Sequence, residues 1–270
     1  MAIMDLGGSD QQIQEIVHNN TIIKCDLLAL NSYGKKRVRF LLEQVLDRYG
    51  DVSYLDDLFM SVMELAFNAV KANYAYIIVL DRIRRMLNYK VSQIDLNSIW
   101  RSKYMMTMYH SFISHPATRD QVRAIIRGEA DVFKIMERAA MEGRSLTPEE
   151  DLQIKRDSSM VNKTLKEKIK ATLSMSLSER RVIIDVINDA PITQDGLDRV
   201  HVKRTRFREY YDSDRVAEFY MENLDETESA GFGAAMIDSR LIGWGLDPWQ
   251  HFKVLTINKK TCANLTVVFN

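Results

Sequence analysis

The stretch "SVMELAFNAVKAN", residues 61–73, decides the fold because it sets three polar side chains inside an apolar helical pattern. Glu64, Asn68 and Lys71 are separated by four and then three positions, which puts all of them on one face of a helix. A helix that only packs against a core has no use for a carboxylate, an amide and an amine along one side. Alone, such a face is usually a solvated surface, so the rest of the sequence has to show whether it lines a site.

The sequence before and through this helix predicts strands mixed with helices. Residues 9–18 have the pattern of a short helix, and residues 21–30 are rich in the β-branched and aliphatic side chains typical of a strand. Residues 35–50 have helical period and end at a glycine, and the helix that contains the opening stretch begins near Leu55.

A long helical block follows, from Tyr74 to about Lys163. It has helical period and few strand signals, and residues 118–143 are amphipathic. The tetrapeptide 147–150, Thr-Pro-Glu-Glu, has the form of a helix start with a capping box. We expect this block to fold as helices outside the sheet and to form a homodimer or partner surface. The alternative is a cap over one end of the sheet with no separate role.

A period of two returns after the block. Residues 168–178 alternate apolar and polar side chains, and residues 180–189 give a second strand after a short polar turn, which predicts a hairpin with one buried face. Glycines precede a short apolar helix within residues 229–245, and residues 251–258 and 264–269 close the chain as a strand pair. This order predicts an α+β fold, a two-layer α/β sandwich with helices on one face of a mixed sheet.

Composition restricts the compartment and the class of partner. Basic and acidic residues number 37 each, so bulk charge offers no attraction for nucleic acid. Cys25 and Cys262 lie far apart without a partner motif and are interpreted as free thiols in a reducing compartment. No apolar run approaches the roughly 20 residues that cross a bilayer, and the N-terminus lacks a signal segment. We expect a cytoplasmic protein that binds neither membrane nor nucleic acid.

Four features, in this order, resemble the GHKL superfamily of ATP-binding domains, which includes histidine kinases, gyrase and the anti-sigma serine kinases. They are Glu64-x-x-x-Asn68-Ala69-x-Lys71 on a helix, "DVINDAPI" (185–192) at the end of a strand, "SAGFGAAMI" (229–237) at a helix start, and the closing strand pair. The resemblance covers about residues 20–75 and 164–270. It implies a Bergerat-type ATP-binding fold in two parts, 1–75 and 164–270, interrupted by a helical insertion at 76–163.

The resemblance gives each residue of the opening stretch a role. Asn68 would hold Mg²⁺ through its side-chain oxygen, Glu64 would act as general base or polarise the attacking group, and Lys71 would face the phosphates of ATP. Magnesium takes oxygen ligands and commonly shares them with phosphate, so a neutral amide beside a triphosphate is chemically suitable. Ala72 stands where the family usually has histidine or tyrosine.

The second glycine box aligns with the family position by position. Gly231 and Gly233 would let backbone N–H groups approach phosphate at a helix start, with Phe232 and Ala234 completing this part of the binding turn. Ser229 replaces the leading glycine of the family.

The first glycine box departs most from the family. The family pattern Asp-x-Gly-x-Gly is replaced by Asn188-Asp189-Ala190-Pro191-Ile192. The family aspartate accepts a hydrogen bond from the adenine amino group, and Asn188 can accept through its carbonyl oxygen. Asp189 is the alternative if the register shifts by one. Ala190 and Ile192 stand at the two glycine positions, so the hinge that follows should be stiffer.

The layout is most similar to the stand-alone anti-sigma-type kinases, because about twenty residues precede the first strand and no transducer domain is expected after the last. We therefore expect an ATP·Mg²⁺-binding protein kinase of bacterial signalling type that acts on a protein partner. The alternative is a degenerate, non-catalytic GHKL-fold module that binds a partner. The altered first glycine box favours the alternative, whereas the intact helix motif and second glycine box favour the kinase.

Two other patterns in the sequence bear on the function. The basic run "KRTRFR" (203–208) is compatible with an RNA patch, with a mobile ATP lid whose basic residues meet phosphate, or with an ordinary solvated face. The five histidines are scattered without zinc-ligand spacing, so no metal site is expected from them.

Overall fold

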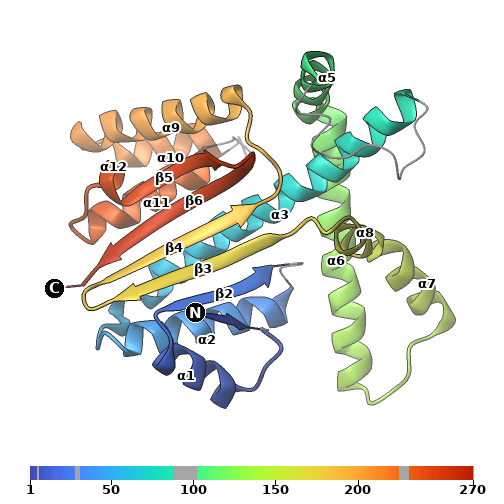
Figure 1. Ribbon diagram of the computed structural model, residues 1–270, viewed down its shortest axis with the longest axis horizontal. Coiled ribbons are helices and arrows are strands. Elements are labelled where there is room, and N and C mark those ends of the chain that lie inside the picture. Colours follow the sequence, from blue (N-terminus) through green and yellow to red (C-terminus); the bar gives the residue numbers. More distant parts are fainter. Residues whose placement is uncertain (5, 28–30, 88–101, 225–230, 270) are drawn as a thin grey trace.

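A computed structural model describes residues 1–4, 6–27, 31–87, 102–224 and 231–269, and it has an α+β architecture built on one mixed sheet (Figure 1). The strands are β1 (Ala2–Met4), β2 (Ile22–Leu27), β3 (Ala171–Ser178), β4 (Arg181–Asn188), β5 (Phe252–Ile257) and β6 (Lys260–Val268). Their spatial order is β1-β2-β3-β4-β6-β5. Strands β1 and β2 pair in parallel and all other neighbours are antiparallel, so the mixed sheet is confirmed.

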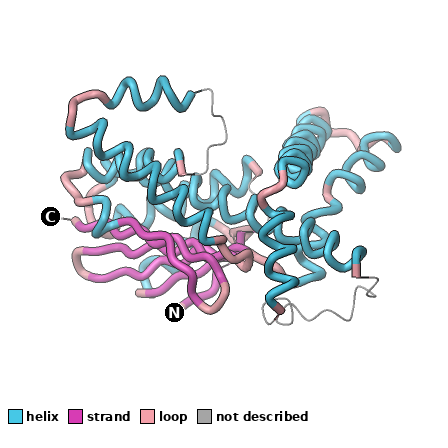
Figure 2. The backbone as a smooth tube through the Cα atoms, turned by 90° about the horizontal axis from the view of Figure 1, so that it is seen from above, coloured by secondary structure: helices cyan, strands magenta, loops and turns pink. Residues whose placement is uncertain are grey.

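The helices lie mostly on one side of the strand layer and beyond one end of it (Figure 2). They are α1 (Asp10–Asn19), α2 (Ser32–Asp47), the 3-10 turn η1 (Val52–Tyr54), α3 (Leu55–Met86), α5 (Lys103–Ile113), α6 (Pro116–Met141), α7 (Pro148–Asp157), α8 (Ser159–Glu167), α9 (Gln194–Asp212), α10 (Val216–Leu224), α11 (Phe232–Gly243) and α12 (Pro248–His251). No helix in the described part of the chain combines the length and apolar character needed to cross a membrane.

Helix α3 is 32 residues long and joins the two parts of the molecule (Figure 1). Its first half buries side chains such as Val62 and Leu65 in the core that α3 forms with the sheet. Its second half buries Leu80 and Ile83 in a separate core with α5. Acidic residues occupy its first turn and arginines its last, which suits the helix dipole. One continuous helix therefore positions the helical block relative to the sheet.

The hairpin of β3 and β4 confirms the predicted alternation. Apolar side chains on one face of β3, such as Leu173 and Met175, are fully buried. The register runs from Ala171 opposite Asn188 to Ser178 opposite Arg181, so the end of β4 that carries Asn188 lies beside the start of β3. This pairing brings the polar end of β4 toward α3.

Residues 103–167 contain four helices and contribute no strand within the described part of the chain. The capping box at the start of α7 is present: Glu150 N donates to Thr147 Oγ1 at 3.2 Å, and Thr147 N donates to Glu150 Oε2 at 2.9 Å. The expectation of helices outside the sheet is met for these residues. The sequence did not indicate the short strand β1, which pairs in parallel beside β2.

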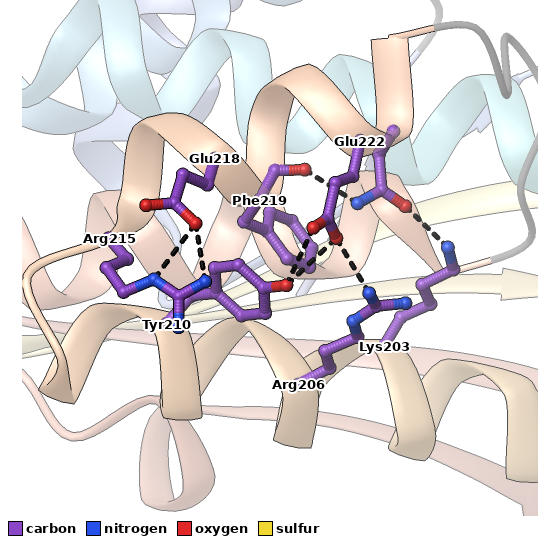
Figure 3. A network of polar contacts seen from close by, with 8 residues as sticks. Lys203, Arg206, Tyr210, Arg215, Glu218, Phe219 and Glu222 are labelled. Atoms are coloured by element: carbon purple, nitrogen blue, oxygen red, sulfur yellow. Dashed lines mark hydrogen bonds and ion pairs between the residues drawn. The ribbon is translucent and has the colours of Figure 1, made fainter.

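The basic run at 203–208 lies inside helix α9, and its cations are engaged within the protein. Lys203 and Arg206 contact the facing helix α10 through Asn223 at 2.5 Å and Glu222 at 2.7 Å (Figure 3). Arg208 pairs with Asp212 on the same helix. The sequence pattern did not predict that residues 203–208 lie within a helix.

Arg204, in the middle of the run, is almost fully buried. It donates to Asp238 of α11 at 2.7 Å and to the carbonyl of Pro248 at 2.9 Å, and its guanidinium lies over the ring of Trp249. Arg204 therefore fits none of the three interpretations that the sequence left open for this run, because it is buried and ties α9 to α11 and α12. Burial raises the pKa of Asp238, although Arg204 opposes that effect.

A polar network fixes the far end of α3 to α8. The Arg84 guanidinium donates to both carboxylate oxygens of Glu167, at 2.9 and 3.1 Å, and Arg84 is only 4 % exposed. Lys163 of α8 pairs with Asp81, one turn before Arg84. Paired donors and acceptors of this kind hold a geometry better than single contacts do.

Glu167→Gln should lower the free energy of unfolding by about 1–2 kcal/mol at pH 7, because Arg84 would exchange its paired carboxylate for a neutral amide and keep only the longer contact to Asp81, at 3.7 Å. The hydrogen bond from Arg84 holds the pKa of Glu167 below its usual value. The stabilisation is therefore present above the unfolded-state pKa, about 4.3, and is lost as the pH falls through the folded-state value. Denaturant titrations should show a wide gap between wild type and variant at pH 7 and a narrow one at pH 3.

Glu179→Gln, in the exposed turn between β3 and β4, is the matched control and should change stability little at either pH. An equal loss of unfolding free energy in both variants would show that the contact between Arg84 and Glu167 contributes no more than an exposed carboxylate does.

Candidate functional site

One cavity of about 760 Å³ collects every residue that the sequence proposed for the site. It lies between α3, the end of β4 with the loop that follows, β6 and the start of α11. The sequence-proposed residues among its walls are Glu64, Asn68, Lys71, Ala72, Asn188, Ala190, Ile192, Gly231, Phe232, Gly233 and Ala234. They come from three segments of the sequence, within residues 64–72, 188–192 and 231–234, so their convergence depends on the fold. Ser229 lies outside the described residues.

Glu64 and Asn68 form a hydrogen-bonded pair on the face of α3 that lines the cavity. Asn68 Nδ2 donates to Glu64 Oε1 at 2.8 Å. This bond uses the amide nitrogen and leaves Asn68 Oδ1 as an acceptor or ligand oxygen. Glu64 is half-buried and Asn68 is exposed, so the pair lies between the core and the opening.

The Glu64 carboxylate lies against the first turn of α11. A Cβ atom added to Gly233 would lie 1.9 Å from Glu64 Oε1, so this position has no room for a side chain while Glu64 keeps its place. Gly231 precedes the helix with φ +103°, a conformation that favours glycine. The amino end of a helix attracts anions through its free N–H groups and its dipole. The Glu64 carboxylate lies beside this turn, next to Gly233.

The opposite end of the cavity is organised around the peptide of Ala190. Its carbonyl oxygen accepts hydrogen bonds from Asn188 Nδ2 at 2.9 Å and from Thr261 Oγ1 at 2.7 Å. Its N–H donates to Asn73 Oδ1 at 3.2 Å. The bond to Ala190 fixes the amide of Asn188, which is 3 % exposed. Among the described residues Asn188 Oδ1 accepts no hydrogen bond, so it is the acceptor this end offers to a ligand.

The structure selects between the two registers of the first glycine box. Asn188 lines the cavity, whereas Asp189 is not among its walls. The Asp189 carboxylate accepts from Lys170 N at 2.8 Å and pairs with Lys260 at 2.5 Å. Asn188 is therefore the residue that faces the cavity, whereas Asp189 contacts Lys170 and Lys260 at the ends of β3 and β6.

Several cavity residues were not anticipated from the sequence. Tyr109 and Ile113 of α5 line the cavity, and the Tyr109 hydroxyl donates to the carbonyl of Pro191 at 3.2 Å. Burial raises the pKa of Tyr109, so the hydroxyl stays protonated at neutral pH and remains a donor. The helical block thus supplies part of the wall, whereas the sequence treated it as separate from the site. Asn73 stands in the opening stretch, but its role became visible only in the fold.

The charged groups of the cavity favour an anionic ligand. Its walls contain one carboxylate, Glu64, and three cations, Lys71, Arg199 and Arg240. Arg240 lies 3.7 Å from Asp57. Within the described part of the chain Lys71 and Arg199 have no ion-pair partner. A ligand with two or more negative charges would balance the cavity.

The donor set argues against a metal held by protein side chains alone. Among the described residues, no group of three or more histidines, cysteines, aspartates or glutamates is placed to hold a metal ion. Magnesium usually keeps several waters and takes one or two protein oxygens together with substrate phosphates. Asn68 Oδ1, beside a cationic cavity, fits that mode of binding.

Comparison with known proteins identifies no relative: no family model matches the chain, and neither the curated proteins nor the solved structures give a match. The GHKL assignment therefore stays a prediction that rests on the motifs and on the cavity they form.

Gly233→Ala should displace the Glu64 side chain and break its hydrogen bond to Asn68, because the new methyl group would overlap the carboxylate. We expect a loss of about 1–3 kcal/mol in unfolding free energy. The same substitution made together with Glu64→Ala should cost clearly less, and a thermodynamic cycle from denaturant titrations measures the difference.

Gly243→Ala, at the last position of the same helix, is the matched control, since a Cβ there would contact nothing within 4 Å. It should be neutral or slightly stabilising. Additive costs for Gly233→Ala and Glu64→Ala would contradict the contact on which this prediction rests.

Proposed function

We propose that the protein binds ATP with Mg²⁺ in the 760 Å³ cavity and transfers a phosphoryl group to a protein partner, in the manner of a GHKL-type kinase. The observation that supports the proposal is the convergence of all the sequence-proposed residues on one cavity with an excess of positive charge. The proposal includes a Bergerat-type arrangement formed by residues 1–75 and 164–270, with residues 76–163 as a helical insertion.

The adenine ring is assigned to the end of the cavity that contains Asn188. Asn188 Oδ1 would accept a hydrogen bond from the exocyclic amino group, since its Nδ2 is already committed to Ala190. Apolar side chains such as Val186 and Ala72 line the cavity and suit a flat heterocycle. The three hydrogen bonds that hold the Ala190 peptide fix the acceptor before any ligand arrives.

The phosphates are assigned to the end between Lys71 and the Gly231–Gly233 turn. Lys71 supplies a positive charge, and the first N–H groups of α11 supply donors along a favourable dipole. Asn68 would hold magnesium through Oδ1, and the ion would offset the negative charge of the triphosphate. Glu64 keeps Asn68 oriented through the 2.8 Å hydrogen bond.

Glu64 is assigned the role of base for phosphoryl transfer. It would accept the proton of the attacking hydroxyl group while that oxygen bonds to the γ-phosphorus. The bond from the γ-phosphorus to the bridging oxygen then breaks, and ADP leaves with the electron pair. The contact of Glu64 with Gly233 puts this carboxylate at the phosphate end of the cavity.

A second candidate function is binding without catalysis, with the cavity as a degenerate nucleotide site in a protein-interaction module. The observation that favours it is the rigid first glycine box: Ala190 replaces a hinge glycine and its peptide is held by Asn73, Asn188 and Thr261. A loop held by three hydrogen bonds suits a ligand that stays bound more than a catalytic cycle in which the loop opens and closes.

Asn68→Ala should reduce the affinity for ATP at least tenfold in the presence of Mg²⁺ and change it little in EDTA, because only the metal loses a ligand oxygen. Isothermal titration calorimetry with both buffers measures the two affinities. Asn162→Ala, an exposed asparagine on α8, serves as control and should bind as wild type does. Wild-type protein that shows no heat and no thermal shift with millimolar ATP·Mg²⁺ would falsify the nucleotide assignment.

Glu64→Gln should leave ATP affinity within a few-fold of wild type, because glutamine keeps the Oε1 acceptor for Asn68. Phosphoryl transfer to candidate partners should fall on the order of 10²-fold or more, since the variant has no base. Single-turnover transfer of labelled phosphate measures this. Equal, measurable activity in both proteins contradicts the role of Glu64, and binding without turnover in either supports the non-catalytic alternative.

A further inference from the structure

A second cavity, of about 570 Å³, opens beside the first one between α3 and α6. The two share Lys71, Ala72, Ala75 and Ile113, so they are neighbouring chambers with a common wall. Ala72 stands at the position where the sequence comparison expected histidine or tyrosine. Its small side chain, together with Ala75 one turn later, leaves little bulk between the chambers.

The walls of this second cavity are strongly cationic. Arg119, Arg123 and Arg127 of α6 lie at intervals of four residues, which places them on one helix face, and Lys71 of α3 faces the same space. No aspartate or glutamate is among the residues that line the cavity. Like charges four positions apart repel and weaken a helix by a few tenths of a kcal/mol for each pair. A bound anion would remove that repulsion.

The acidic groups near α6 do not neutralise this face. Asp120 lies 3.3 Å from Arg123 and is well exposed. Glu129 accepts a hydrogen bond from the Tyr74 hydroxyl at 2.7 Å, and Asp131 pairs with Lys134. Within the described residues neither Arg119 nor Arg127 has an ion-pair partner. Arg119, Arg127 and Lys71 therefore give the second cavity a positive charge that no described carboxylate balances.

The remaining walls make the hollow suitable for an anion. Val122, Ile126 and Ala75 give it apolar walls, and Thr118 adds a buried hydroxyl that is already bonded to the carbonyl of Phe112. Low-dielectric walls strengthen the field of cations gathered in a cleft. Guanidinium groups bind phosphate through paired hydrogen bonds.

We propose that the second cavity is an anion-binding site, in which Arg119 and Arg127 of the helical block, with Lys71, bind the phosphate group of a small second ligand beside the first cavity. The site extends the proposed function, because it would hold a phosphorylated molecule next to a nucleotide. It does not depend on it, since the arginines bind phosphate whether or not the first cavity takes ATP.

The test uses inorganic tripolyphosphate as the probe, titrated calorimetrically into the whole protein at low ionic strength without Mg²⁺. Wild type should bind it, with an affinity that falls as salt is added. Arg119→Ala combined with Arg127→Ala should weaken binding at least tenfold. Arg138→Ala, which removes an exposed arginine farther along the same helix, should stay within about twofold of wild type.

Thermal unfolding checks that the double variant is folded, and its two positions make no ion pair within the described chain whose loss would destabilise it. Three results overturn the proposal: no binding by wild type, equal weakening by Arg138→Ala, or full binding by the double variant. ATP titrations with the same proteins keep the two sites distinct. If the double variant loses tripolyphosphate binding but still binds ATP, the second site is supported. If wild type binds tripolyphosphate but not ATP, only the nucleotide assignment of the first cavity is contradicted.

Discussion

Helix α3 packs one face into the core and lines the two cavities with the other, and most of the architecture follows from this double role. Its buried face packs on the sheet and then on α5, whereas its polar face lines both cavities. No glycine or proline interrupts residues 55–86, so the helix holds Glu64 and Asn73 at a fixed separation of roughly 14 Å, from a rise of 1.5 Å per residue. The glycine turn of α11 meets one end and the Ala190 peptide meets the other.

This arrangement explains why the polar residues of the site are few but well supported. Glu64 is placed by Gly233 and Asn68, and Asn188 is placed by Ala190, whose carbonyl also accepts from Thr261. Gly233 and Asn68 lie on helices, and the loop peptide of Ala190 is itself bonded to Asn73 of α3 and Thr261 of β6. Sites built on regular elements keep their geometry better than sites built on loops.

Local patterns predicted the elements, but only the fold showed how they meet. The face of Glu64, Asn68 and Lys71 and the β3–β4 hairpin were predictable because helix and strand periods are visible within a dozen residues. The choice between Asn188 and Asp189 was not, since a shift of one residue in a strand exchanges its two faces. Tyr109 gave no signal because its contact with Pro191 joins distant segments. The burial of Arg204 was not predictable, because a basic run does not reveal a buried partner such as Asp238.

The pairing of β2 with β3 has a consequence for how the chain reaches this structure. Lys170 and Asp26, at the ends of these strands, pair at 2.8 Å although 144 positions separate them. Loop-closure entropy grows only by about 0.6 kcal/mol for each doubling of length, so the helical block adds little thermodynamic cost to the sheet. The kinetic effect is larger, because contacts between distant segments slow folding. The β3–β4 hairpin and the helices depend on local contacts, whereas β2 joins the sheet only through a contact that spans more than 140 positions.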